Sequence, residues 1–267
     1  MSKKIALSIF LFIVLFIVLM MLFQKISKKE NIKHLLEQKL DGRLLPHEVN
    51  NQKKLNDILN NGIRSFELDL FFYTDTNHLS YFKIGHDKEN LDQLIFETYL
   101  KKLKKYKIKK IWMDVKNVST QNIDKILTRL NYLDKHYNIK PIVIFESALR
   151  SDQLRKISYA GFHTSYYLYN NPIHEMLLRE DDKGLIKEAN TIKQQIEKQE
   201  MKAISFNSLL YPFIKDYLEP ILSSNIVYHT WKSVKFKNYN AIQKMQEKKY
   251  FQDKRIKTIL YYYDAKD

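Results

Sequence analysis

GIRSFELDLFFYTDTNHLSYFKIGHD, residues 62–87, carries the strongest structural signal in this chain. Its first half is an apolar run typical of a buried strand, yet it contains Glu67 and Asp69. Side chains alternate between the two faces of a strand, so both carboxylates project to the same side. Burying such a pair is costly unless a positive group meets it. The segment therefore predicts a strand that presents two acidic side chains to a cation.

Two histidines flank this strand. His86 ends the next extended stretch, and His47 precedes the strand by about one helix. An imidazole with an unperturbed pKa of about 6.5 can give or take a proton near neutral pH. Phosphodiester cleavage needs a base on the attacking hydroxyl and an acid on the leaving oxygen. We therefore expect His47 and His86 to be catalytic. The other six histidines are assigned to the surface or the core: His34, His78, His136, His163, His174 and His229. Of these, His163 and His229 lie near predicted strands.

Short apolar runs alternate with amphipathic stretches along the rest of the chain. This alternation predicts a parallel sheet covered by helices. About eight strand–helix units in this length match a (β/α)8 TIM barrel. An open doubly wound sheet is the alternative, but no helix opens with the glycine-rich phosphate loop of that fold. The predicted strands span residues 43–47, 63–72, 111–115, 142–145, 163–169, 203–206, 226–229 and 258–263, with 79–84 as a hairpin extension. The predicted helices include 51–60, 91–106, 120–136, 183–199, 211–218 and 240–247.

Asp114 adds a third carboxylate, inside the strand predicted next to that of Glu67 and Asp69. The active sites of TIM barrels collect at the carboxyl ends of the strands, where neighbouring side chains meet. We therefore predict that these three acids bind one Ca²⁺ or Mg²⁺, because both ions prefer carboxylate and water ligands. Lys116 would add a second positive charge for a phosphate group. The alternative is an ion-paired cluster in which Lys116 or Arg64 neutralises the acids without a metal.

Two further residues complete the predicted substrate-binding set with Lys116. Glu146 stands where a strand meets its loop, and it is expected either in the pocket or, equally, as an ion-paired acid. Trp231 offers an aromatic wall to a substrate, with packing as the alternative. The tyrosines of the strand 163–169 are expected to pack against helices: Tyr166, Tyr167 and Tyr169.

The order of these residues resembles the pattern of the glycerophosphodiester phosphodiesterases. That family places a strand with Glu-x-Asp before a turn and a His-Asp pair, and later carries an acidic-x-Lys strand and a strand ending in tryptophan. The resemblance covers most of the chain from about residue 44 onward. The matching segments are Gly62…Glu67-Leu-Asp69…Asp75…His86-Asp87, Asp114-Val-Lys116, Val227-Tyr-His-Thr-Trp231 and Ile259 to Asp264.

This resemblance implies a (β/α)8 barrel, with the chain as a divergent member of the phospholipase C-like phosphodiesterase superfamily. It implies a divalent cation on the three acids, His47 and His86 as the acid/base pair, and Lys116 as a phosphate contact. Relatives open with His-Arg-Gly, whereas Glu48 and Val49 follow His47 here. The substrate is therefore left open among glycerophosphodiesters, phospholipids and envelope glycans. A catalytically inactive barrel that binds a phosphorylated ligand is the alternative.

Residues 5–23 form an apolar stretch that only Ser8 interrupts, with lysines on both sides. About 20 apolar residues span a bilayer as a helix, and no A-x-A-like cleavage site follows this run. We expect an uncleaved membrane anchor over residues 1–27, a polar linker over 28–40 and the barrel over 41–267. Because both flanks are basic, the positive-inside bias does not decide the orientation. We favour a single pass with the barrel on the extracytoplasmic (periplasmic) side.

The chain has 267 residues, no cysteine and a formal net charge of +15. The lack of cysteine excludes disulfides, thiolate metal sites and cysteine nucleophiles. The positive charge suits lipid headgroups or nucleic acid, or it is a lysine-rich solvated surface. No nucleic-acid-binding motif is recognised, so no nucleic-acid partner is expected.

Overall fold

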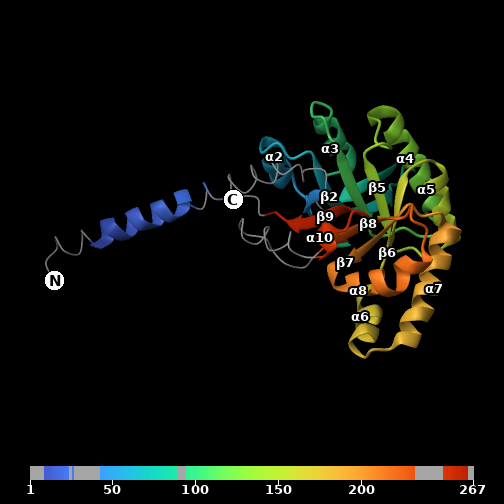
Figure 1. The fold of residues 1–267 in the computed structure, drawn as a ribbon. Coiled ribbons are helices and arrows are strands. Elements are labelled where there is room, and N and C mark those ends of the chain that lie inside the picture. Colours follow the sequence, from blue (N-terminus) through green and yellow to red (C-terminus); the bar gives the residue numbers. More distant parts are fainter. Residues whose placement is uncertain (1–8, 24–25, 27–42, 89–93, 232–248, 264–267) are drawn as a thin grey trace.

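The computed structural model describes residues 9–23, 26, 43–88, 94–231 and 249–263 (Figure 1). The strands are β1 (Leu44–His47), β2 (Ser65–Thr74), β3 (Ser80–Ile84), β4 (Lys110–Val115), β5 (Val143–Ser147), β6 (His163–Tyr167), β7 (Ala203–Asn207), β8 (Val227–Trp231) and β9 (Ile256–Tyr262). The α-helices are α2 (Gln52–Asn60), α3 (Phe96–Leu103), α4 (Ile123–Tyr137), α5 (Arg155–Tyr159), α6 (Asn170–Leu178), α7 (Asp182–Gln199), α8 (Tyr211–Phe213) and α10 (Lys249–Gln252). The barrel also contains a π-helical turn, η4 (Ile214–Leu218), and three short 3-10 turns, η2 (Asp152–Leu154), η3 (Ser208–Leu210) and η5 (Glu219–Ile221).

The strands form one curled sheet in the order β1-β9-β8-β7-β6-β5-β4-β2-β3. β3 is antiparallel to β2, and each of the other ladders is parallel. The two ends of the parallel part meet just after β1, where the amide of Val49 donates to the carbonyl of Glu67 in β2 at 2.9 Å. The barrel predicted from the sequence is therefore confirmed, and the open doubly wound sheet is excluded.

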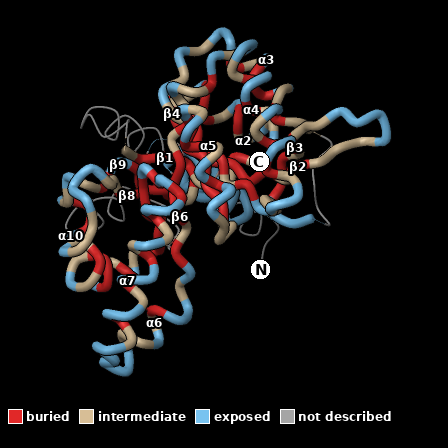
Figure 2. Tube along the Cα trace, turned by 90° about the vertical axis from the view of Figure 1, so that its right-hand side faces the viewer, coloured by how far each residue is buried: buried red, intermediate tan, exposed pale blue. Residues whose placement is uncertain are grey.

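Helices cover the outside of the curled sheet, and the buried residues lie along the strands and the inner faces of the helices (Figures 1 and 2). α2 shows how the sequence produces this layer. Asn51 caps its amino end by accepting a hydrogen bond from the amide of Lys54 at 2.8 Å. Leu55, Ile58 and Leu59 recur at helical spacing and face the core. Gly62 follows with φ of 77°, a left-handed conformation that suits glycine after a helix.

The interior of the barrel is filled rather than open. Leu45, Trp112, Ile144 and Leu260 form a small apolar cluster contributed by β1, β4, β5 and β9. Trp231 packs against this cluster from β8. These side chains form an apolar layer across the barrel.

Most predicted elements agree with the structure to within a few residues. The predicted helix over 91–106 is shorter, since α3 spans Phe96–Leu103. The short α6 was not predicted. The predicted helix over 240–247 lies outside the described residues.

Residues 9–23 form a helix with exposed large apolar side chains. Within the described residues, no helix combines the length and the apolar character needed to cross a bilayer. Residues 1–8 of the predicted anchor and all of the predicted linker 28–40 lie outside the described part of the chain.

Asp253, just before β9, ties the start of this strand to α8 and η4. It accepts hydrogen bonds from the hydroxyl of Tyr211 at 3.0 Å and from the backbone amide of Arg255 at 2.8 Å, and it pairs with Lys215 at 3.2 Å. Burial alone would raise the pKa of Asp253, but these bonds outweigh it and lower the pKa below 3.8. The stabilisation is therefore present above pH 3.8 and is lost as the pH falls through the folded-state pKa.

We expect Asp253→Asn to lower the free energy of unfolding by about 2 kcal/mol at pH 7, because the bonds lose their charged acceptor. Urea unfolding as a function of pH measures this. The difference from the parent should shrink as the pH falls below about 4. Asp216→Asn, at an exposed acid in η4, is the matched control. A difference that stays constant down to pH 3 would contradict this account.

Candidate active site

Three acidic side chains meet at the carboxyl ends of β2 and β4. Glu67 and Asp69 project from β2 with 1% of each residue exposed, and Asp114 is the direct register partner of Asp69 on β4. Each acid offers an oxygen within 4.8 Å of the others. The structure thus brings together the three acids that the sequence analysis selected.

Lys116 lies among these acids. Its ammonium is 2.7 Å from Asp69 Oδ1 and 2.5 Å from Asp114 Oδ2. Burial disfavours the charged form of Lys116, but Asp114 and Asp69 outweigh it and raise its pKa. This lysine therefore stays protonated. Arg64, the other cation considered from the sequence, instead donates to the carbonyls of Leu59 and Ile63.

One lysine does not balance three carboxylates. Burial raises the pKa of Glu67, and the neighbouring Asp69 raises it further. Burial also raises the pKa of Asp114, against the opposing effect of Lys116. The donor set consists of closely spaced carboxylate oxygens, which are the ligands that Ca²⁺ and Mg²⁺ prefer. The residues present therefore fit a divalent cation.

His47 ends β1 beside this cluster. Its Nε2 is 3.7 Å from Glu67 Oε2, and its Nδ1 is 3.8 Å from Glu48 Oε1. Its ring meets the ring of Tyr262 edge-on, with centroids 5.1 Å apart. Burial lowers the pKa of His47, although Glu48 and Asp69 act in the opposite direction. At neutral pH the imidazole is therefore uncharged and able to accept a proton.

The residue after His47 has an unusual backbone conformation. Glu48 has φ of 56°, a left-handed conformation that costs a non-glycine residue about 1–2 kcal/mol. In this conformation its amide donates to Glu67 Oε2 at 2.5 Å. A backbone amide thus satisfies a buried carboxylate oxygen, and strain of this kind is typical of functional sites.

Asn50 is a site residue that the sequence analysis missed. Its side-chain amide donates to Asp69 Oδ2 at 2.7 Å, and its carbonyl oxygen accepts from the backbone amide of Asp69 at 2.9 Å. These two bonds fix the orientation of the Asp69 carboxylate. The polar run Asn50-Asn51 just after the first strand was the available signal, but nothing in the sequence distinguishes a helix cap from a positioning amide.

His86 lies in the loop after β3, on an exposed rim. Its Nδ1 is 2.9 Å from Asp87 Oδ1, and its side chain is 56% exposed. The loop is held to β2 by a hydrogen bond from the amide of Gly85 to the carbonyl of Asp69 at 3.1 Å. Burial raises the pKa of Asp114, and His86 lies close enough to oppose this rise by a small electrostatic effect. The two predicted catalytic histidines thus lie near the acid cluster, His47 at the end of β1 and His86 in the loop after β3.

The remaining predicted residues, Glu146 on β5 and Trp231 on β8, lie inside the barrel. Glu146 is 2% exposed and accepts a hydrogen bond from the hydroxyl of Ser205. Burial raises its pKa, and Asp114 raises it further. Trp231 stacks on Tyr167, with ring centroids 5.4 Å apart and an interplanar angle of 10°.

The expectation that Tyr167 packs against helices is wrong. Only its neighbour Tyr166 is buried in the core between the sheet and the helices. Tyr167 stacks on Trp231 and lies close enough to Glu146 and Asp114 for them to raise its pKa, after the larger effect of burial. Alternation predicts that these two tyrosines face opposite ways, but the sequence does not indicate which one enters the barrel.

No protein-family model matches the sequence, and no curated protein matches it. The structure is similar to a glycerophosphodiester phosphodiesterase from Parabacteroides distasonis, with a TM-score of 0.52 and 11% identity over 82% of this chain and 92% of that chain. It is also similar to an Oleispira antarctica phosphodiesterase in complex with the product sn-glycerol-3-phosphate. There the TM-score is 0.51 and the identity 12%, over 82% of this chain and 92% of that chain. The chain therefore has the α/β barrel fold of the glycerophosphodiester phosphodiesterases.

We expect Glu67→Gln to raise the melting temperature of the cation-free protein, because it removes one of three crowded carboxylates. The same substitution should weaken Ca²⁺ or Mg²⁺ binding by about a hundredfold, because the ion loses a charged ligand. Thermal unfolding with added Ca²⁺, Mg²⁺ or EDTA measures both effects. Glu197→Gln, at an exposed acid on α7, is the control. An unchanged cation response in Glu67→Gln would show that this cluster is not the metal site.

Proposed function

We propose that this chain is a metal-dependent phosphoric diester hydrolase. The observation that carries the proposal is the joint placement of Glu67, Asp69 and Asp114 with Lys116 and His47 at the carboxyl ends of adjacent strands. In parallel α/β barrels this end holds the active site. The likeness to two phosphodiesterase structures supports the same reaction class.

The chain's own groups account for proton transfer and charge balance. His47, kept neutral by burial, accepts a proton from the attacking water, whose oxygen bonds to phosphorus as the bond to the leaving oxygen breaks. The neutral ring carries a proton on one nitrogen only, so its other nitrogen is free to act as the base. His86, in the exposed loop after β3, donates a proton to the leaving oxygen. Lys116 contacts the phosphate oxygens and offsets their charge.

A divalent cation on Glu67, Asp69 and Asp114, either Ca²⁺ or Mg²⁺, would supply Lewis-acid charge to the phosphate as the pentavalent centre forms. Asn50 holds Asp69 in place for it.

The substrate pocket continues along the inner wall. The stacked Tyr167 and Trp231 form an aromatic side, and Glu146, whose pKa is raised by burial, lies close enough to Tyr167 to act on it electrostatically. The substrate is a phosphodiester whose alcohol groups rest on this aromatic side: a glycerophosphodiester, a phospholipid or an envelope glycan. Release of a phosphomonoester such as glycerol phosphate is consistent with the product in the Oleispira antarctica structure. Glu48 stands where relatives carry arginine, so Lys116 takes a larger share of phosphate binding.

We expect the purified chain to hydrolyse an aryl phosphodiester such as bis(p-nitrophenyl) phosphate, and EDTA to abolish turnover. His47→Ala should lower kcat about 10²–10⁴-fold, because it removes the general base. His136→Ala, at an exposed histidine on α4, is the matched control and should retain full activity. Full turnover of His47→Ala would rule out the assigned role.

The second candidate function is that of an inactive barrel that binds a phosphorylated ligand, and one contact in the structure favours it. Lys116 already bridges Asp69 and Asp114, as an inactive barrel would require if a lysine had replaced the metal. Such a protein would bind a phosphorylated ligand without cleaving it. A folded chain that binds neither Ca²⁺ nor Mg²⁺, and that hydrolyses none of the three substrate classes, would favour this second function.

The proposed location is a membrane, with a single pass and the barrel on the extracytoplasmic (periplasmic) side. The support is the apolar stretch 5–23 and the exposed apolar side chains of the helix over 9–23. Residues 1–27 would serve as the anchor and residues 28–40 as the linker to the barrel.

We expect the full chain to remain in the membrane pellet after alkaline carbonate extraction, and removal of residues 1–27 to release it. A protease added to intact spheroplasts should digest the barrel if it lies outside. Extraction of the full chain by carbonate would contradict the anchor. Protection of the barrel in sealed spheroplasts would reverse the orientation.

A further inference from the structure

The connection from α3 to β4 is the most lysine-rich segment of the chain. Residues 101–110 read KKLKKYKIKK, with seven lysines and no acid. Four of these lysines are exposed and form no ion pair with a carboxylate within the described part of the chain: Lys101, Lys104, Lys105 and Lys107. Such a surface attracts anions of many kinds, so charge alone does not identify a partner.

The acids of the neighbouring helices do not offset this charge. Each of the three acids on α3 and α4 already pairs with a cation outside the lysine-rich segment. The pairs are Glu97 with Arg129, Asp124 with Lys156 at 2.7 Å, and Asp134 with Lys140 at 3.3 Å. The exposed lysines therefore keep an excess of positive charge that suits an anionic partner.

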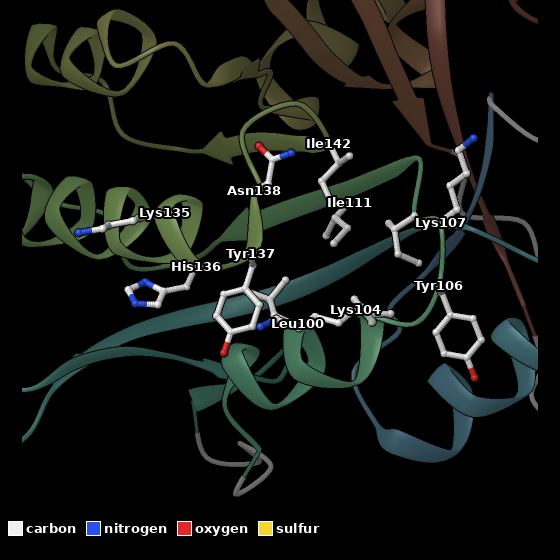
Figure 3. Close-up of a pocket in the computed structure, with 12 residues that line it drawn as sticks. Leu100, Lys104, Tyr106, Lys107, Ile111, Lys135, His136, Tyr137, Asn138 and Ile142 are labelled. Atoms are coloured by element: carbon white, nitrogen blue, oxygen red, sulfur yellow. The ribbon is translucent and has the colours of Figure 1, made fainter.

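An apolar hollow lies beside these lysines, between α3, α4 and the starts of β4 and β5 (Figure 3). Its volume is about 460 Å³, and no acid is found among the described residues that line it. The aliphatic part of its lining consists of Leu100, Leu103, Ile108, Ile111 and Ile142. Lys104, Lys107 and Lys135 also border it. An apolar hollow bordered by lysines fits a molecule with an anionic head and an apolar body.

The lysines at this hollow diverge. Figure 3 shows Lys107 and Lys135 pointing in opposite directions away from it. They therefore do not enclose one small anion, whose binding would require donors that converge. Separated ammonium groups instead suit an extended surface on which each meets a different phosphate.

The aromatic rings at the hollow already have cations over them. Arg64 and Lys105 lie 5.1 and 5.4 Å from the ring centroid of Tyr106. The ammonium of Lys104 lies 4.8 Å from the ring centroid of Tyr137. Single-stranded nucleic acids bind by stacking their bases on aromatic faces, for which these rings are poorly placed. A membrane interface needs no free ring face, and tyrosine and lysine are typical of it.

We propose that this surface docks on a bilayer that contains anionic phospholipids. The surface, called the lysine face, consists of Lys101, Lys104, Lys105, Lys107 and Lys135 around the hollow. The ammonium groups meet the headgroup phosphates, and the hollow receives an apolar part of a lipid at the interface. Docking requires neither hydrolysis nor insertion of the proposed anchor. The acid cluster lies at the other end of β4, so a docked barrel keeps it accessible.

The test measures how close the lysine face comes to lipid headgroups. Because the chain has no cysteine, His136→Cys can carry a single donor fluorophore at the edge of the hollow. The full chain is reconstituted with nanodiscs that carry an acceptor on their headgroups. The discs contain phosphatidylcholine alone or with about one third phosphatidylglycerol. We expect energy transfer to rise in the anionic discs and to fall back in about 0.5 M salt, because salt screens the charges.

A second label position reports the orientation. Leu209→Cys places the donor at an exposed residue just after β7, at the carboxyl end of the strands. We expect a smaller rise there than at residue 136. An equal or larger rise at residue 209 would place the opposite end of the barrel on the bilayer and overturn the proposal.

The charge-removing variant combines Lys104→Gln, Lys105→Gln and Lys107→Gln. It should lose the rise at residue 136, whereas arginine at the same three positions should retain it, because arginine keeps the charge. Melting temperatures within a few degrees of the parent's establish that each variant is folded. No rise in the anionic discs for the parent chain would refute the proposal without any variant.

The matched control removes three exposed lysines from α7: Lys183→Gln, Lys187→Gln and Lys198→Gln. It should keep the rise. Equal losses in the two triple variants would overturn the lysine face in favour of non-specific attraction by net charge. A fluorescent oligonucleotide replaces the discs in a parallel titration. Binding of the oligonucleotide that only the charge-removing variant weakens, with no rise in anionic discs, would assign the surface to nucleic acid instead.

Discussion

Repulsion among the carboxylates at the ends of β2 and β4 is the constraint on which the candidate site depends. Glu67 and Asp69 are almost fully buried, and Asp114 is the register partner of Asp69. Lys116 neutralises only part of this charge. Buried carboxylates are tolerated only when hydrogen bonds and cations meet them. The surrounding polar groups, and the fit to a divalent cation, follow from that requirement.

The segment after β1 supplies many of the hydrogen bonds that the buried carboxylates need. Within three residues, the amide of Glu48 reaches the Glu67 carboxylate, Val49 closes the sheet, and Asn50 holds Asp69 by two hydrogen bonds. Closure of the barrel and orientation of the acids are therefore parts of one local structure. A change in the backbone there would disturb the fold and the site together, which fits the left-handed conformation kept at Glu48.

The barrel is electrically polarised along its axis. Acids gather at the carboxyl ends of the strands, and lysines and histidines gather at the amino ends. Between them lies the apolar layer of Leu45, Trp112, Ile144 and Leu260. No charged side chain belongs to this described layer, so the two ends do not pair directly.

The sequence by itself determined the barrel class, the order of its strands along the chain and the three acids with their lysine. It could do so because strand alternation and i, i+2 spacing are local properties. Only the tertiary structure decided that Asn50 positions Asp69, that Tyr167 rather than Tyr166 faces the acids, and that His163 meets His229. These contacts join residues on different strands or loops. Their geometry depends on strand register and barrel closure, which no local pattern in the chain encodes.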